Sequence, residues 1–209
     1  MDAQAAIRLG EGQTTEFKFR VDSQRKIAKT LVAFANSDGG TIYIGVKDNG
    51  SIAGVRGEEE LFMIEGAADL HTRPPVQFHH EALEIEGKVV LAIEIPPSTT
   101  RPHEAREEEG ASPREWSAYF RQGAANFRAN GVLLQLWRTQ HLEKSLSETE
   151  QRVLHVLKNA ESRVSVTQVF KSVGLSIKEV EHALATLIAW EIADYWAGEK
   201  GIRFGLIGD

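Results

Sequence analysis

The chain has 209 residues, of which 42% are hydrophobic and 26% charged, so it can bury a core and is not a disordered polymer. It contains no cysteine, which excludes disulfide bonds and thiolate metal sites. The formal net charge of -6 argues against non-specific polyanion binding over the whole surface. The sequence shows neither a signal-peptide pattern nor a membrane-spanning apolar run, so we expect a cytoplasmic protein that does not bind membranes.

The first expected element is a strand over residues 13–21, in which apolar and charged residues alternate. The odd-numbered positions, among them Phe17 and Phe19, should face the core. The even-numbered positions, among them Glu16 and Lys18, should face solvent.

A helix is predicted over residues 24–36, with Asp22 or Ser23 as its cap. Its buried stripe follows the helical period and consists of Ile27, Thr30, Leu31, Phe34 and Ala35. Gly39-Gly40 ends this segment, and a strand over residues 41–47 follows.

Asn49-Gly50 predicts a type I′ hairpin turn, because that turn needs positive φ at both central residues. The remaining predicted elements are a helix near 58–70, strands over 76–85 and 88–95, a polar loop over 98–115, a strand over 116–121 and a helix near 129–142 that packs across the sheet. Residues 1–142 are therefore predicted to form an α+β domain with a mixed or antiparallel sheet and packed helices. The runs Glu58–Glu60 and Arg106–Glu109 are interpreted as solvated acidic faces.

Residues 143–209 are predicted to form a smaller second domain of three helices and a two-stranded hairpin, which is the winged-helix pattern. The exposed side of its third helix combines Lys178 with Glu179 and Glu181, so a protein contact is favoured there over reading of DNA. Lys200 and Arg203 on the hairpin are the better candidates for phosphate contacts.

Three carboxylates, Glu11, Glu16 and Asp48, are candidate metal ligands and catalytic residues. If they converge, their oxygens suit Mg²⁺ or Mn²⁺, and the ion would assist phosphodiester cleavage. Lys18, on the same strand face as Glu16, would hold the phosphate. The alternative is that all are surface residues on a charged strand face.

Cations cluster between residues 18 and 29, and they are candidates for neutralising a nucleic-acid backbone. They are Lys18, Arg20, Arg25, Lys26 and Lys29. The alternative is a helix face that meets only solvent and neighbouring acids. Asn36 and Gly39-Gly40 are candidates for a phosphate-binding loop, although such glycines more often only make a turn. No nucleotide-binding motif is present.

The N-terminal residues resemble the Alba-like Schlafen domain, a family of nucleic-acid-binding modules. The resemblance is carried by Glu11 with Glu16-Phe-Lys18, by Ala33 to Val46, by Asp48-Asn-Gly50 with Gly54-Val55, and by Tyr119-Phe-Arg121-Gln-Gly123-Ala-Ala-Asn126. It implies a DNA or RNA partner, with Arg121 among the contacting residues. Family members with RNase activity cut structured RNA such as tRNA, which implies metal-dependent roles for Glu11, Glu16 and Asp48. The chain departs from the family at Lys47, where an aspartate is common.

The leading hypothesis is a nucleic-acid-binding transcriptional regulator that acts as a homodimer, since the RNase members use two lobes and this chain has one. A metal-dependent endoribonuclease is the first alternative. A catalytically inert protein-interaction module is the second.

Overall fold

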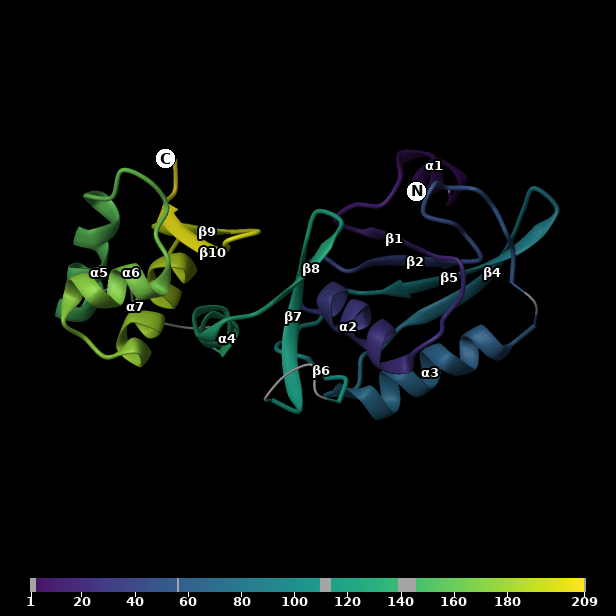
Figure 1. Cartoon of the computed structure of the whole chain (residues 1–209), viewed down its shortest axis with the longest axis horizontal. Coiled ribbons are helices and arrows are strands. Elements are labelled where there is room, and N and C mark those ends of the chain that lie inside the picture. Colours follow the sequence, from purple (N-terminus) through teal and green to yellow (C-terminus); the bar gives the residue numbers. More distant parts are fainter. Residues whose placement is uncertain (1–2, 56, 110–113, 139–145, 209) are drawn as a thin grey trace. The chain divides into compact units, whose positions relative to one another are not determined.

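The computed structural model describes residues 3–55, 57–109, 114–138 and 146–208, and it divides into compact units at residues 1–128 and 129–209 (Figure 1). The expected boundary between residues 142 and 143 lies outside the described residues. Helix α4 (Gly131–Arg138) belongs to the C-terminal unit. Our expectation that it packs across the N-terminal sheet is wrong, because Val132 and Leu136 join the C-terminal core instead.

The N-terminal unit contains two four-stranded sheets. Its elements are α1 (Ala3–Leu9), β1 (Thr15–Lys18), α2 (Gln24–Ala35), β2 (Gly40–Ile44), α3 (Glu59–His71), β3 (Thr72–Arg73), β4 (His79–Ile85), β5 (Lys88–Ile95), β6 (Glu104–Arg106), β7 (Trp116–Gln122) and β8 (Ala125–Arg128). The first sheet has the order β1-β2-β5-β4, with β1 parallel to β2 and the other pairs antiparallel. The second sheet has the order β3-β6-β7-β8 and is antiparallel. The predicted α+β class with a mixed sheet is confirmed.

Helix α2 lies between the two sheets (Figure 1). Ser23 is its cap, with Oγ accepting a hydrogen bond from the backbone N–H of Lys26. The predicted stripe is buried, and Ala28, Val32 and Ala33 are buried as well, so that eight of the twelve residues are enclosed. The first sheet packs on one side of α2 and the second sheet covers the other side. With one sheet alone, that other side would be exposed to solvent.

The turn at Asn49-Gly50 differs from the prediction, because only Gly50 has a positive φ, of 80°. Asn49 uses its Oδ1 to accept a hydrogen bond from the backbone N–H of Ser51 at 3.0 Å. Two consecutive positive φ angles occur instead at Glu86 (51°) and Gly87 (69°), which join β4 to β5. A side-chain hydrogen bond therefore replaces the strained backbone at the first turn.

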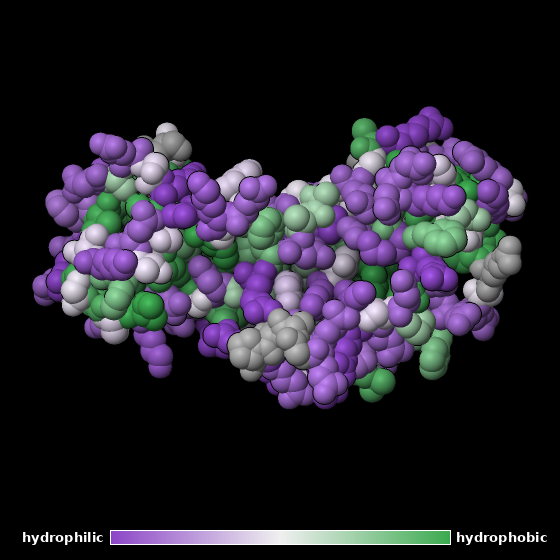
Figure 2. All heavy atoms as spheres, in the orientation of Figure 1, coloured by the Kyte–Doolittle hydropathy of each residue, from purple (hydrophilic) through white to green (hydrophobic). Residues whose placement is uncertain are grey.

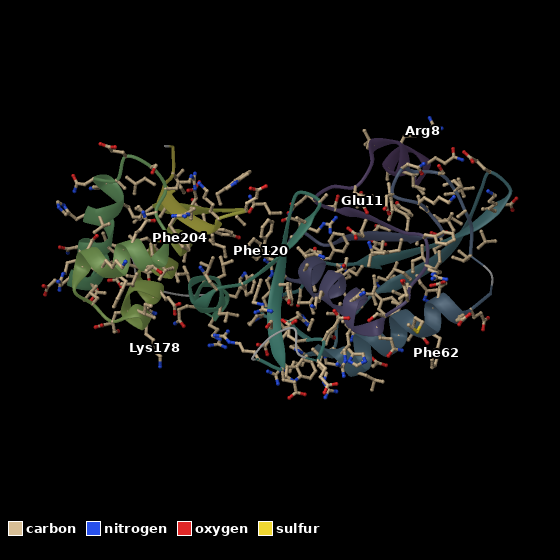
Figure 3. The ribbon with its side chains drawn as sticks, viewed as in Figure 1. Arg8, Glu11, Phe62, Phe120, Lys178 and Phe204 are labelled. Atoms are coloured by element: carbon tan, nitrogen blue, oxygen red, sulfur yellow. The ribbon has the colours of Figure 1, made fainter. Side chains whose placement is uncertain are left out.

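The C-terminal unit contains the three predicted helices and the hairpin. They are α5 (Glu148–Lys158), α6 (Val166–Val173), α7 (Ile177–Ala189), β9 (Ala193–Gly198) and β10 (Gly201–Leu206). Each of the three helices begins at a serine with a reciprocal capping box. Phe204 of β10 is fully buried in the core of this unit (Figure 3).

Polar side chains cover most of the face of the molecule that Figure 2 shows. None of the described helices has the length and apolar composition needed to cross a membrane.

Gly40 tests how tightly α2 and the sheets are packed. A Cβ at this position would lie 2.6 Å from the Phe34 ring and 2.8 Å from the Thr14 carbonyl oxygen. We expect Gly40→Ala to lower the free energy of unfolding by about 2 kcal/mol, because the buried ring and the backbone must both move. Gly12→Ala is the control, since a Cβ there meets nothing within 4 Å. Urea unfolding of both variants makes the comparison, and equal stability of the two would contradict the packing argument.

Candidate functional site

Arg121 on β7 connects the two sheets through a fully buried guanidinium group. Its Nη2 forms an ion pair with Glu16 Oε2 at 2.7 Å and donates to the Thr15 carbonyl oxygen at 3.0 Å. Its Nε donates to the Gly12 carbonyl oxygen at 3.0 Å, and Nη1 donates to Asn126 Oδ1 at 3.1 Å. These bonds use the guanidinium inside the fold, so the expectation that Arg121 contacts nucleic acid does not fit its surroundings.

Glu16 on β1 is buried and meets two cations. Besides Arg121 at Oε2, the Lys18 Nζ lies 2.5 Å from Oε1. Glu11 is turned toward the backbone, where its Oε1 accepts a hydrogen bond from the Phe17 N–H at 2.9 Å. Asp48 is exposed in the loop after β2.

The three predicted metal ligands do not come together. No group of three or more acidic or histidine side chains within the described residues is arranged to hold a metal ion. Glu16 is also compensated by two positive charges, which disfavours a divalent cation beside it. The residues present therefore do not fit the Mg²⁺ or Mn²⁺ site that the resemblance implies, and no metal-assisted step follows from this geometry.

The Asn36 side chain, at the end of α2, forms hydrogen bonds to the second sheet and the segment before it, and it does not line an open loop. Its Nδ2 donates to the carbonyl oxygens of His103 and Tyr119, both at 2.8 Å, and its Oδ1 accepts from the His103 N–H at 2.8 Å. A Cβ on Gly39 would lie 2.7 Å from the Ile95 carbonyl oxygen, and the Gly39 N–H already bonds the Phe34 carbonyl oxygen. The predicted phosphate loop is therefore occupied by contacts within the fold.

Glu107 lies in a run that we interpreted as a solvated acidic face, yet only 4% of it is exposed. Its carboxylate meets Lys29 at 3.1 Å, Arg128 at 2.8 Å and the Tyr119 hydroxyl at 2.6 Å. Burial by itself would raise the pKa of Glu107, but the Tyr119 hydroxyl and the Lys29 ammonium outweigh it and lower the pKa to about 2. The charge of Lys29 is thus compensated, which removes Lys29 from the candidate nucleic-acid contacts.

Three cations near α2 have no acidic partner within the described residues. None of the ion pairs among the described residues includes Arg20, Arg25 or Lys26. Phe19 is 53% exposed beside them, so our expectation that it faces the core is wrong. Strand β1 ends at Lys18, and the alternation of faces ends with it. Lys18, Phe19, Arg20, Arg25 and Lys26 together are called the basic patch below.

The third helix of the C-terminal unit, α7, packs against α4, α5 and α6. Glu181 lies directly against Gly131, and the residues from Ala183 to Leu187 are buried. The residues left exposed near its start include Lys178, which projects away from the unit (Figure 3). The exposed start of this helix carries Lys178 beside Glu179, and this mixed charge does not favour contact with a DNA groove.

The hairpin presents a different surface. Trp196 on β9 is 61% exposed and lies opposite Arg203 on β10. Arg203 Nη1 donates to Gln168 Oε1 at 2.7 Å, and Lys200 is exposed at the turn. Sequence reasoning identified the two cations but not Trp196.

Gln13 is a second residue that sequence reasoning missed. Its Nε2 donates to Asp38 Oδ2 at 2.8 Å and to the Arg121 carbonyl oxygen at 3.2 Å, and its Oε1 accepts from the Gly123 N–H at 2.8 Å. Because its partners are more than 20 residues away in the chain, no local pattern could reveal it.

Comparison with known proteins identifies a family to which the sequence is similar. The sequence profile described as Schlafen, AlbA_2 matches residues 11–130, more than half of the chain. A search of curated protein sequences gives no significant match.

Two solved structures are similar in fold. A crystal structure of a protein from Corynebacterium diphtheriae matches with a TM-score of 0.50 and 13% identity over 91% of this chain, which spans 34% of that protein. A solution structure of the N-terminal domain of a RecG-related ATP-dependent DNA helicase protein from Nitrosomonas europaea matches with a TM-score of 0.40 and 19% identity. This match covers 71% of the present chain and 99% of that domain. The first likeness concerns the fold alone.

The Arg121–Glu16 pair should dominate the stability of the N-terminal unit. Arg121→Met keeps much of the side-chain volume but leaves Glu16 Oε2 and two backbone carbonyl groups without the guanidinium donor, so that Lys18 is the one remaining cation on Glu16 among the described residues. We expect a loss of about 3–5 kcal/mol in the free energy of unfolding. In a double-mutant cycle with Glu16→Gln, the two effects should be strongly non-additive. Additive effects in urea unfolding would show that the pair is not coupled.

Glu107 should make stability depend on acid pH. Its folded pKa of about 2 lies below the unfolded value of 4.5, so its contribution is complete above pH 4.5 and is lost as the pH falls toward 2. This corresponds to roughly 3 kcal/mol at neutral pH. The stability difference between the wild type and Glu107→Gln should therefore shrink steadily below pH 4.5. Glu65→Gln, at an exposed position on α3, should show no such trend.

Proposed function

Since the chain belongs to the Schlafen, AlbA_2 family, we propose that it is a nucleic-acid-binding regulator that holds the phosphate backbone at its basic patch. One observation carries the proposal: Arg20, Arg25 and Lys26 have no acidic partner within the described residues, whereas Lys29 and Arg121 do. Cations without an ion-pair partner attract a polyanion even when the net charge of the protein is negative.

The position of these cations on α2 strengthens the argument. The first turn of the helix carries Arg25 and Lys26 and no acidic residue. The helix dipole places a partial positive charge at this end, so cations here are unfavourable for folding. A phosphate group bound at the patch would offset that repulsion. The arrangement is therefore suited to binding rather than to stability.

Phe19 gives the basic patch a second kind of contact. Its ring is exposed between Lys18 and Arg20. An aromatic ring among cations can stack on a nucleobase while the cations hold the neighbouring phosphates, and this does not depend on base sequence. We therefore propose backbone and stacking contacts rather than reading of base edges in this unit.

We also propose that the C-terminal unit is a winged helix that contacts nucleic acid through its hairpin. The support is the exposure of Trp196 and Lys200, with Arg203 on the neighbouring strand, together with the mixed charge at the exposed start of α7. A cavity of about 760 Å³ between α5 and α6, lined by His155, Lys171 and Gln168, lies on the side where Gln168 meets Arg203.

A homodimer would supply two basic patches, and we propose it as the binding form.

Charge reversal at the basic patch provides the test. Arg20→Glu combined with Lys26→Glu should weaken binding to a fluorescent 20-base-pair DNA, a 20-nucleotide single strand or an RNA hairpin by at least tenfold. The slope of log affinity against log salt should fall by about 2, because two phosphate contacts are lost.

Lys178→Glu on α7 is the control, because it changes charge on a surface that this proposal does not use. Binding should be unchanged within about twofold for this variant. If Lys178→Glu weakens binding while the double variant does not, α7 and not the basic patch is the binding surface. Retention of full affinity by both variants would reject nucleic-acid binding at either place.

A further inference from the structure

Strand β4 is the free edge of the first sheet (Figure 1). All seven of its residues, His79–Ile85, pair with β5 in an unbroken antiparallel register. Within the described residues, no strand pairs with its other side. Edges of this length are usually protected by a bulge, a proline or charged side chains; β4 has neither a bulge nor a proline, and its charged residues are Glu81 and Glu84. Its outer backbone N–H and C=O groups are therefore available to an added strand.

A cavity of about 790 Å³ adjoins this edge on the face of the sheet that α2 does not cover. Its floor is a row of paired residues that crosses all four strands. The row consists of Thr15, Thr41, Glu94 and His79. Ala6 of α1 and Pro97 form parts of the walls. A strand added beside β4 would direct every second side chain toward this cavity.

The charged residues that line the cavity indicate which kind of partner would bind there. Asp38, Glu81 and Glu94 line it, and no lysine or arginine does. None of the ion pairs within the described residues involves Glu81, Glu84 or Glu94. By contrast, Glu16 and Glu107 in the same unit are each paired with two cations. The free edge thus carries negative charge that the protein itself does not compensate.

We propose that β4 and the adjoining cavity bind an extended basic peptide by strand addition. The added backbone bonds the outer edge of β4, and alternate lysine or arginine side chains enter the cavity toward Glu81 and Glu94. The methylene stems of these side chains lie along the apolar walls while the charged ends meet the carboxylates. A second copy of this chain is a poorer occupant, because its own β4 would bring Glu81 and Glu84 against the same acidic edge.

The test uses two synthetic strand-forming peptides, one alternating lysine with threonine and the other alternating glutamate with threonine. Fluorescence anisotropy with the full chain should detect binding of the lysine peptide and not of the glutamate peptide. Glu81→Lys combined with Glu94→Lys should weaken binding at least tenfold. Glu65→Lys combined with Asp69→Lys makes the same charge change on the exposed surface of α3 and should have little effect. Equal weakening by both pairs would overturn the proposed location.

Strand addition is separated from simple charge attraction by N-methylation of the lysine peptide. Methylating the alternate N–H groups along one edge should abolish binding when that edge faces β4, because the charge is unchanged but the donors are lost. A peptide methylated along both edges that still binds with full affinity would overturn strand addition. Hydrogen exchange should show new protection in β4 when the unmodified peptide is added.

Two further results decide the partner and the independence of this surface. Sedimentation could show a dimer that charge reversal at β4 disrupts. If the lysine peptide does not dissociate that dimer, a second copy of the chain is the occupant and the proposal fails. The basic-patch variant Arg20→Glu with Lys26→Glu should bind the peptide normally, because it lies outside this surface. Peptide binding can therefore fail or succeed independently of nucleic-acid binding.

Discussion

The buried guanidinium of Arg121 is the interaction on which the N-terminal unit depends. A guanidinium stays charged and needs acceptors for its five N–H donors. When it is fully buried, those acceptors must come from the protein, so the guanidinium fixes the positions of the groups that accept its hydrogen bonds. Here most of the acceptors come from β1 and the loop before it, one more comes from Asn126 on β8, and the arginine itself lies on β7. The pair of sheets is thereby held in one relative position with α2 between them. The basic patch begins where β1 ends, so its geometry depends on the same link.

The residues that carry the family resemblance mostly hold the fold together. Glu16 neutralises Arg121, Asn36 joins α2 to β7, and Gly39 and Gly40 allow close contacts that a Cβ would prevent. A carboxylate that compensates a buried cation is not available as a metal ligand without leaving that cation unpaired. The nucleic-acid contacts that we propose therefore use less distinctive residues, namely exposed cations and aromatic rings on the same framework.

Charge is separated on the N-terminal unit, although the chain as a whole is moderately acidic. The cations of the basic patch extend from the end of β1 into the first turn of α2, and the uncompensated carboxylates lie along β4 at the other edge of the same sheet. The two surfaces are suited to partners of opposite charge. Our two proposals assign a polyanion to one edge of this sheet and a basic peptide to the other.

The sequence by itself determined the elements whose signals are local. Ser23 capped the helix as predicted, the stripe from Ile27 to Ala35 was buried, and Glu86-Gly87 joined the two expected strands. The α+β class followed from these elements. Local patterns succeed here because a cap, a period and a turn are each set by residues a few positions apart.

Only the tertiary structure decided which charged residues are free. Glu107 and Lys29 are separated by 78 positions and Arg121 and Glu16 by 105, so no pattern in the sequence could show that they compensate each other. The same holds for Phe19. The alternating pattern predicted that its ring faces the core, but β1 ends at Lys18 and the ring is exposed to solvent. The energy of a charge depends on what surrounds it after folding, and those surroundings come from distant parts of the chain.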